Sequence, residues 1–579
     1  MAGTARTTPA PRRAVARRKT RAAASEASAR AAADSILGAN PFIGIRLGDV
    51  LNAARKIGRQ AVKQPRLAVE KQASLLRELT AIVAGRSSIA PEPGDRRFTD
   101  PTWAENPLYR RHLQAYLACG QALDAFVAHS GLDPKTRERA RFVAATLTSA
   151  LAPTNALIGN PAALKTAFET GGRSLARGFA NRITDLRHNG WMPSQVDRTS
   201  FELGRNLALS PGAVVFRNDV LELIQYAPKT PRVRARPHII VPPQINKFYV
   251  FDLAPGKSIV EYLVGHGFQV FAVSWRNPTP KHRRWDMDTY VEALLDAIAA
   301  AREITGSDDV IAHAACSGAM TTAALLGHLA RTGDRQVRAA TLMVAVLGGT
   351  SDSALGLFAG PEAIRAAKQA SKRQGVLKGE DMGRVFAWLR PNDLVWNYWV
   401  NNYLLGKRPP AFDVLYWNND TTRLPAAFHA QLLDIFADDL FRTPGALKVC
   451  GAPIDLAAVK CDKYVVAGTT DHITPWKGVY QAARSFGGRS RFVLSSSGHI
   501  QSLINPPGNA KASFFVNSKA IADPDRWLAG AQSTPGSWWG DWAEWLAARS
   551  GAWRAAPEAL GSARHPAAEP APGSYVVEP

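Results

Sequence analysis

The amino-acid sequence predicts an α/β protein in which a parallel sheet is covered by helices on both faces and is preceded by a mainly helical N-terminal domain. From about residue 40 to residue 205, apolar residues recur at three- and four-residue spacing, as in residues 108–126 and 134–151. After about residue 207, short apolar runs alternate with amphipathic helical segments, which is the pattern of βαβ units. With 46% hydrophobic and 21% charged residues the chain can bury a large core, so a mostly disordered protein is excluded.

The domain boundaries follow from changes in composition along the chain. Residues 1–34 are a low-complexity stretch with eight Lys and Arg residues against Glu26 and Asp34, and we expect a disordered basic tail there, although a transit peptide has a similar composition. The helical domain is expected at residues 35–206 and the α/β domain at residues 207–579. Between about residues 348 and 462 the alternation of strands and helices stops. Long insertions of this kind usually cover an active site, so we expect a cap.

The elements of the α/β domain are predicted by their apolar patterns. Strands are expected at residues 238–241, 268–273, 310–315, 341–347, 464–467 and 492–494, and helices at residues 287–305 and 320–329. The first of these helices is the clearest, because its apolar residues form one stripe between an N-cap at Asp286 and a terminating Gly306. The last predicted feature is a set of four tryptophans at helical spacing: Trp538, Trp539, Trp542 and Trp545. We expect them either to pack on the core or to contact a product.

Charge and cysteine usage limit the partners and the compartment. The net charge of +23 favours anionic partners such as nucleic acid, acidic lipid or phosphorylated small molecules. The four cysteines are scattered and form no CxxC pair, which argues against a disulfide framework and a structural zinc site. We find no secretory signal and no apolar run of about 18 residues, so we expect a reduced, intracellular protein without a transmembrane segment.

A cysteine stands where a strand turns into a helix. The strand at 310–315 ends in Ala314-Ala315-Cys316-Ser317-Gly318, which is the strand–turn–helix context of a nucleophile elbow with Cys in place of Ser. The helix that follows directs its N-terminus at Cys316, which favours a thiolate and a developing oxyanion. Oxyanion donors are expected from the N–H of Ser317 and from that of Gln244 or Ile245. A buried packing cysteine, or Ser317 as the nucleophile, is the alternative.

Two further residues follow in the chain order of an α/β-hydrolase triad. Asp471 lies past the strand at 464–467 and His499 past the strand at 492–494, at the strand ends where such sheets place their active sites. We therefore predict an α/β-hydrolase fold with a cap insertion and a Cys–His–Asp triad. Asp471 as the N-cap of a helix before Trp476, and His499 as a hydrogen-bonded loop residue, are the alternatives. His472 is expected to be structural, and Cys119, Cys450 and Cys461 to be packing residues.

These residues and their surroundings resemble the polyhydroxyalkanoate synthases, from about residue 38 to the C-terminus. The single-polypeptide class II type, which accepts medium-chain substrates, is the most similar, as the cap sequence and Gln501 indicate. Ala314, Ala319 and Gly348 depart from the residues usual in the family. The resemblance rests on Asn40-Pro41-Phe42, Asp95-Arg96-Arg97-Phe98, Val241-Pro242-Pro243-Gln244-Ile245-Asn246-Lys247, Val273-Ser274-Trp275-Arg276-Asn277-Pro278, Trp396-Asn397-Tyr398-Trp399, Trp417-Asn418-Asn419-Asp420, Gly498-His499-Ile500-Gln501-Ser502 and Asn505-Pro506-Pro507-Gly508-Asn509.

The resemblance implies an acyltransferase that polymerises (R)-3-hydroxyacyl groups from coenzyme A thioesters and releases CoA. His499 would take the Cys316 proton, and Asp471 would either orient His499 or help to activate the incoming 3-hydroxyl. No cofactor is expected, because CoA is part of the substrate and a product. The resemblance also implies a cytoplasmic homodimer at the surface of polymer granules. The anionic partner of the positively charged protein is then expected to be the phosphates of CoA, and no specific nucleic acid is expected.

Two other functions remain open on the sequence alone. A polyester depolymerase or thioesterase can use the same fold and triad, because fold does not decide chemistry. A non-catalytic protein that binds granules or nucleic acid is suggested by the charge, and it would make Cys316, Asp471 and His499 dispensable.

Overall fold

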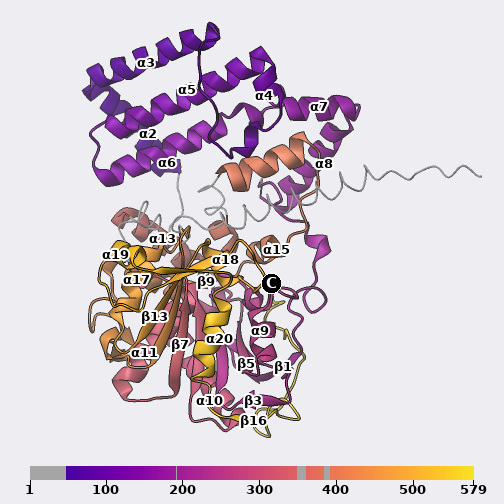
Figure 1. Cartoon of the computed structure of the whole chain (residues 1–579), viewed down its shortest axis with the longest axis vertical. Coiled ribbons are helices and arrows are strands. Elements are labelled where there is room, and N and C mark those ends of the chain that lie inside the picture. The colour runs from indigo at the N-terminus through magenta and orange to yellow at the C-terminus, as the bar shows by residue number, and fades with distance from the viewer. Residues whose placement is uncertain (1–46, 191, 349–359, 384–390, 472) are drawn as a thin grey trace, which may run out of the picture.

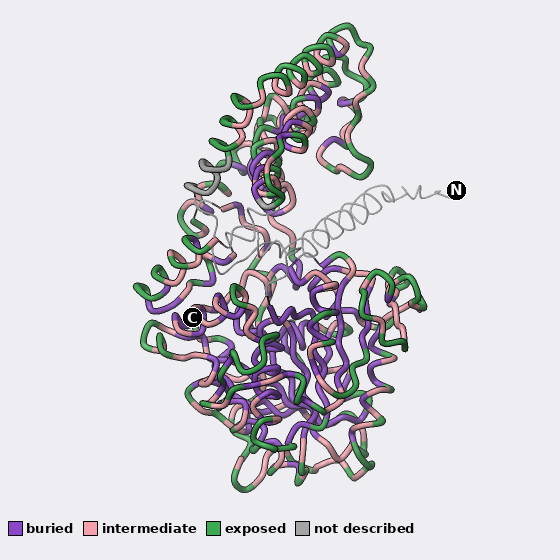
Figure 2. The backbone as a smooth tube through the Cα atoms, turned by 90° about the vertical axis from the view of Figure 1, so that its left-hand side faces the viewer, coloured by how far each residue is buried: buried purple, intermediate pink, exposed green. Residues whose placement is uncertain are grey.

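The computed structural model describes residues 47–190, 192–348, 360–383, 391–471 and 473–579. The predicted tail at residues 1–34 and His472 lie outside the described residues. Two bodies are visible in Figure 1: a group of helices from the first third of the chain, and below it a body built around a twisted sheet. Figure 2 shows buried backbone concentrated in the sheet body, whereas the helical body is largely exposed or intermediate.

The helical body is formed by elements whose starts the sequence marks with caps. Pro107–His129 (α5) starts at Asn106, whose side chain accepts the N–H groups of Leu108 and Tyr109, and Pro134–Ala150 (α6) starts at Asp133. Both predicted helices are confirmed. The other α-helices of this body are Leu47–Lys63 (α2), Pro65–Val83 (α3), Thr102–Glu105 (α4), Pro161–Glu169 (α7) and Arg173–His188 (α8).

The sheet has ten strands in the order β1-β2-β5-β4-β6-β7-β12-β13-β14-β15. The strands are Gly212–Arg217 (β1), Leu221–Tyr226 (β2), Pro237–Val241 (β4), Gln269–Trp275 (β5), Val310–Ala315 (β6), Val337–Met343 (β7), Asp462–Gly468 (β12), Ser490–Ser495 (β13), Ser513–Val516 (β14) and Gln532–Pro535 (β15). The central strands from β5 to β13 pair in parallel, and two strands at each edge pair antiparallel. The predicted α/β class is confirmed, and the sheet is mixed.

The sequence patterns missed the edge strands and misplaced one central strand. Strand β2 contains the fully buried Glu222, whose charge is compensated by Arg217 at the end of β1, and this polar residue hides the strand in a hydrophobicity pattern. The strand predicted at residues 341–347 ends at Met343 instead. Val344 has a positive φ of 45°, so the apolar residues after it form a buried loop rather than a longer strand.

Helices cover both faces of the sheet, as predicted. Met287–Thr305 (α10) has the expected bounds, with the Asp286 cap and Gly306 at its end. Cys316–Thr332 (α11) begins four residues earlier than predicted, at the cysteine itself. Trp539–Ala547 (α20) buries Trp538, Trp539 and Trp542, so this cluster packs on the core. The remaining helices are Ile259–Gly265 (α9), Trp476–Ser485 (α17), His499–Leu503 (α18) and Pro524–Ala529 (α19).

The insertion between β7 and β12 contains helices and two short strand pairs. Its elements among the described residues are Pro361–Gln374 (α13), Val376–Leu377 (β8), the π-helical Asn392–Trp396 (η6) and Trp399–Leu404 (η7), Asp413–Asn419 (α15), Leu424–Pro425 (β9), Ala426–Asp438 (α16), Lys448–Val449 (β10), Ala452–Pro453 (β11) and the 3-10 helix Leu456–Ala458 (η8). Part of it contacts the helical body. Tyr403 donates to Asp185 of α8 at 2.8 Å, and a Cβ on Gly178 would lie only 1.8 Å from the Tyr403 carbonyl oxygen, so α8 packs directly on η7.

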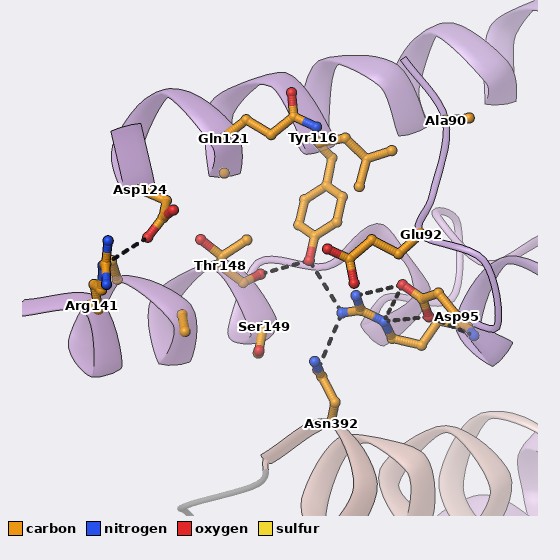
Figure 3. A pocket seen from close by; sticks show the side chains of 15 residues that line it. Ala90, Glu92, Asp95, Tyr116, Gln121, Asp124, Arg141, Thr148, Ser149 and Asn392 are labelled. Carbon is orange, nitrogen blue, oxygen red and sulfur yellow. Dashed lines mark hydrogen bonds and ion pairs between the residues drawn. The ribbon is translucent and has the colours of Figure 1, made fainter. Parts of the chain in front are cut away.

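A second contact joins the two bodies beside a cavity of about 420 Å³ between α5 and α6 (Figure 3). Arg97 is paired with Asp95 at 2.8 Å. It also donates to the Tyr116 hydroxyl at 3.3 Å and to the Asn392 side chain of η6 at 3.2 Å. The cavity is lined by residues of the helical body and by Asn392, and it contains none of the predicted catalytic residues.

A chain of hydrogen bonds between buried groups ties α20 to the sheet. The Trp542 indole donates to Thr341, and His313 links Thr341 to His238 at 3.0 and 2.8 Å. His238 in turn contacts Ser550, which donates to the Leu546 carbonyl. Because the single hydroxyl proton of Ser550 is used in the bond to Leu546, the Ser550 oxygen accepts from His238 Nε2–H. Burial lowers the pKa of both histidines and so favours neutral imidazoles, and with both rings neutral His313 donates to His238 and Thr341 donates to His313.

We predict that acid weakens the fold through these two histidines. Burial is the main cause that lowers the pKa of both His238 and His313. In the unfolded chain the two histidines bind protons near pH 6.5, whereas in the folded chain they stay neutral at that pH. The free energy of unfolding therefore falls as the pH drops below about 6.5. Between pH 7.5 and 5.5 the loss from the two histidines should be about 3 kcal/mol. Urea unfolding of the wild type against the double variant His238→Gln, His313→Gln tests this, and equal pH dependence in both proteins would contradict it.

Candidate active site

Cys316 lies at a strained turn between β6 and α11. Its φ of +50° falls in the left-handed region, which a non-glycine residue rarely adopts and which a nucleophile elbow requires. Gly318 is needed two residues later, because a Cβ there would lie 2.4 Å from the Pro242 carbonyl oxygen. The turn is therefore pressed against the loop that follows β4, and the thiol stands at the carboxyl end of the sheet.

His499 brings the thiol and the aspartate together. It begins α18 and is 3% exposed, and the neighbouring Cys316 thiol contributes to raising the pKa of its imidazole. Its Nδ1 lies 2.7 Å from Asp471 Oδ2, which leaves Nε2 for the thiol. The structure thus brings the three predicted residues together.

The Asp471 carboxylate is fully engaged by protein groups. Oδ1 accepts the N–H groups of Ile473 and Thr474 at 2.9 and 3.0 Å, and Oδ2 accepts the Thr474 hydroxyl at 2.6 Å as well as His499. The N-cap of α17 is Pro475, so the alternative reading of Asp471 as that cap is wrong. Sequence reasoning missed Thr474, although a Thr three residues after an Asp is a typical turn signal.

The electrostatics of this pair favour a charged imidazole. Burial alone would lower the pKa of His499, but the Asp471 charge and hydrogen bond outweigh it, with a further contribution from Cys316, and the pKa is raised. Burial would likewise raise the pKa of Asp471, yet His499 and the bonds from Thr474 lower it. His499 is therefore a strong base for the Cys316 proton, and Asp471 stays ionised.

The groups expected to donate to an oxyanion are not equivalent. The Gln244 N–H donates to the Ser317 hydroxyl at 3.0 Å, so it is already engaged in this structure. The same bond engages the buried Ser317 hydroxyl, which does not fit Ser317 as the nucleophile. The backbone N–H of Ser317, in the first turn of α11, and that of Ile245 are the remaining predicted donors.

The other three cysteines differ from one another. Cys119 is exposed, so the prediction that it is a packing residue is wrong: its position on α5 faces outward. Cys450 and Cys461 are half-buried. Burial raises the pKa of the Cys450 thiol to about 11 and also raises that of Cys461, which disfavours a reactive thiolate at either position.

Among the described residues, no group of three or more His, Cys, Asp or Glu side chains is arranged to hold a metal ion. In the same part of the chain, no helix is both long and apolar enough to cross a membrane.

A sheet whose strand turns into a helix at a strained cysteine, with a hydrogen-bonded histidine and aspartate beside it, defines an α/β-hydrolase-fold protein. Comparisons with known proteins agree. A family profile described as "alpha/beta hydrolase fold" matches residues 237–506, and one described as "Poly-beta-hydroxybutyrate polymerase (PhaC) N-terminus" matches residues 94–263.

Relatives extend this similarity over nearly the whole chain. It is 53% identical over 549 residues to Poly(3-hydroxyalkanoate) polymerase 1 of Ectopseudomonas oleovorans, which covers 95% of this chain and 98% of that protein. Polymerase 2 of the same organism is 50% identical, with coverage of 93% and 96%. The polymerase subunit PhaC of Cupriavidus necator is 40% identical, with coverage of 86% and 85%. The chain belongs to the poly(3-hydroxyalkanoate) polymerase family, and the predicted resemblance is confirmed.

Proposed function

We propose that this protein is an acyltransferase that polymerises (R)-3-hydroxyacyl groups from coenzyme A thioesters, through an acyl group bound to Cys316. The observation that carries the proposal is the cysteine at the strained elbow, beside a His499 that is hydrogen-bonded to Asp471. The similarity to the two Ectopseudomonas oleovorans polymerases supports the reaction class. The medium-chain preference that we propose for the acyl group rests on the cap sequence and on Gln501.

A thiol nucleophile suits this reaction because of the energies of its bonds. The incoming acyl group is a thioester, so transfer to Cys316 exchanges one thioester for another and loses little driving force. The enzyme-bound thioester can then acylate a 3-hydroxyl and form an oxoester, which is a downhill step. A serine would spend that driving force in the first transfer.

Each residue of the site has one role in the proposed mechanism. His499 accepts the Cys316 proton, the thiolate attacks the thioester carbon, and the proton leaves with the CoA sulfur. The Ser317 and Ile245 N–H groups stabilise the oxyanion of the tetrahedral intermediate. In the second half-reaction His499 takes the proton of the incoming 3-hydroxyl, whose oxygen attacks the acyl carbon on Cys316. The C–S bond breaks as the oxoester forms, and His499 returns the proton to the Cys316 sulfur. No step requires a metal.

We assign Asp471 the orienting role rather than activation of the substrate hydroxyl. Its carboxylate accepts four hydrogen bonds from protein groups and is only 4% exposed, so no lone pair is left for a substrate hydroxyl. It fixes the ring of His499 and stabilises the imidazolium that forms.

The test is an assay of purified protein with (R)-3-hydroxyoctanoyl-CoA that follows CoA, polymer and free 3-hydroxy acid together. We expect one CoA to be released for each 3-hydroxyacyl unit added to polymer, with little free 3-hydroxy acid. Free acid without polymer would instead identify a thioesterase, and degradation of added polymer would identify a depolymerase.

We also propose that the protein acts as a cytoplasmic homodimer at the granule surface. The tail would be residues 1–34, the helical domain residues 35–206 and the catalytic domain residues 207–579, with residues 348–462 as its cap. Support for granule contact comes from exposed apolar side chains on the helical body, among them Ile158, Phe179 and Phe168, which is 91% exposed.

We predict that the full chain carrying Ile158→Ser, Phe168→Ser and Phe179→Ser loses most of its sedimentation with isolated granules. Its turnover of soluble hydroxyacyl-CoA should remain close to that of the wild type, because these residues are remote from Cys316 in the chain and exposed. Unchanged sedimentation would contradict this assignment of granule contact to the helical domain.

A further inference from the structure

A short segment of the insertion runs along the loop that follows β4. Thr421 forms a β-bridge with Asn246, and the Thr422 N–H donates to the Ile245 carbonyl at 3.2 Å. The Thr422 hydroxyl donates to the Gln244 carbonyl oxygen. A few residues earlier, the Trp417 indole donates to the Lys247 carbonyl at 2.7 Å. The insertion therefore donates hydrogen bonds to three carbonyl groups of this loop, those of Gln244, Ile245 and Lys247.

One of these carbonyl groups shares a peptide with the expected oxyanion donor. The C=O of Gln244 and the N–H of Ile245 belong to the same planar trans peptide, so the two groups point in opposite directions. A hydroxyl that fixes the carbonyl also fixes the direction of the N–H. On the side of the loop that faces α11, the Gln244 N–H is anchored to Ser317, the residue after the thiol.

The surroundings make the Thr422 hydroxyl hard to replace. Thr422 is 2% exposed and Gln244 is 3% exposed, so solvent has little access to this carbonyl. Without the hydroxyl, the buried carbonyl has to turn toward another donor to regain a hydrogen bond. That rotation would carry the Ile245 N–H with it.

We propose that Thr422 is a positioning residue for the reaction: its hydroxyl orients the Gln244–Ile245 peptide so that the Ile245 N–H acts with that of Ser317 on the thioester oxygen. This inference rests on the proposed function. It assigns to the insertion a part in building the oxyanion site, in addition to covering it.

The experiment compares the full-length wild type with Thr422→Val and Thr422→Ser. Valine keeps the shape and removes the donor, whereas serine keeps the donor. With (R)-3-hydroxyoctanoyl-CoA we expect Thr422→Val to lower kcat about 10- to 100-fold, with KM changed by less than about threefold. Thr422→Ser should recover most of the lost kcat.

A second measurement separates positioning from damage to the fold. Alkylation by iodoacetamide attacks a saturated carbon and forms no oxyanion, so its rate at Cys316, followed by peptide mass, reports the thiol and His499 alone. We expect the same alkylation rate in Thr422→Val as in the wild type. A parallel loss of alkylation and acyl transfer, a normal kcat in Thr422→Val, or an equal loss in the serine variant would overturn the inference.

The proposed function fails in a different way. If the wild-type protein itself released no CoA and formed no polymer from (R)-3-hydroxyoctanoyl-CoA, the proposed polymerisation reaction would be wrong. The inference about Thr422 fails where the wild type is active and any of these three outcomes is found in the Thr422 variants.

Discussion

Cys316→Ala is expected to abolish polymer formation from hydroxyacyl-CoA, with kcat falling at least about 10³-fold. Alanine removes the thiol that holds the growing acyl chain in the proposed mechanism. The variant should fold normally, because an alanine tolerates the turn no worse than the cysteine does. CoA release and polymer mass measured together check this result.

Two variants sharpen this prediction. Cys119→Ala should leave activity unchanged, because Cys119 is exposed on α5 and serves as the control for loss of a thiol. Cys316→Ser should at best become acylated slowly and then stall, because an oxoester on serine offers no driving force for transfer to another hydroxyl. Steady polymer growth by Cys316→Ser would contradict the argument from bond energies.

Asp471→Asn is expected to slow acylation and chain growth alike, by about 10²- to 10⁴-fold. The carboxylate accepts the His499 Nδ1–H at 2.7 Å, and an amide in its place favours the wrong tautomer and leaves the imidazolium unpaired. His499→Gln should cost at least as much, because it removes the base itself. The measurement is a rapid-quench time course that resolves the first release of CoA from later turnovers.

The same time course distinguishes the two roles that the sequence left open for Asp471. If Asp471 oriented His499, as its four hydrogen bonds support, the first release of CoA would already be slow in Asp471→Asn. A normal first release followed by arrested growth would instead favour activation of the substrate hydroxyl. Thr474→Val, which removes one bond to Asp471, should show a milder loss of the same kind.

The part of the site that the sequence predicted depends on local patterns. A strand, a sharp turn of small residues and a helix are consecutive in the chain, so the elbow at Cys316 is readable from one short segment. Asp471 and His499 follow β12 and β13, and parallel strands bring their carboxyl ends to one edge. These patterns sufficed to expect the three residues together.

The remainder depends on contacts between distant segments. The proposal of Ile245 rather than Gln244 as an oxyanion donor rests on the bond between Gln244 and Ser317, and the role proposed for Thr422 rests on a contact across 178 residues. The end of β7 was misplaced because the apolar residues after Met343 are buried as a loop. Strand β2, next to the edge strand β1, was missed because its buried Glu222 is paired with a residue of another strand.

The most direct test of the central claim is the mass of the enzyme during turnover. Full-length protein is mixed with (R)-3-hydroxyoctanoyl-CoA, quenched in acid and digested, and the peptides are examined for an added 3-hydroxyacyl group. We predict that the group is found on the peptide that carries Cys316, is lost on treatment with neutral hydroxylamine, and is absent from Cys316→Ala. Polymer formation without acylation of Cys316, or acylation confined to another residue, would contradict this account.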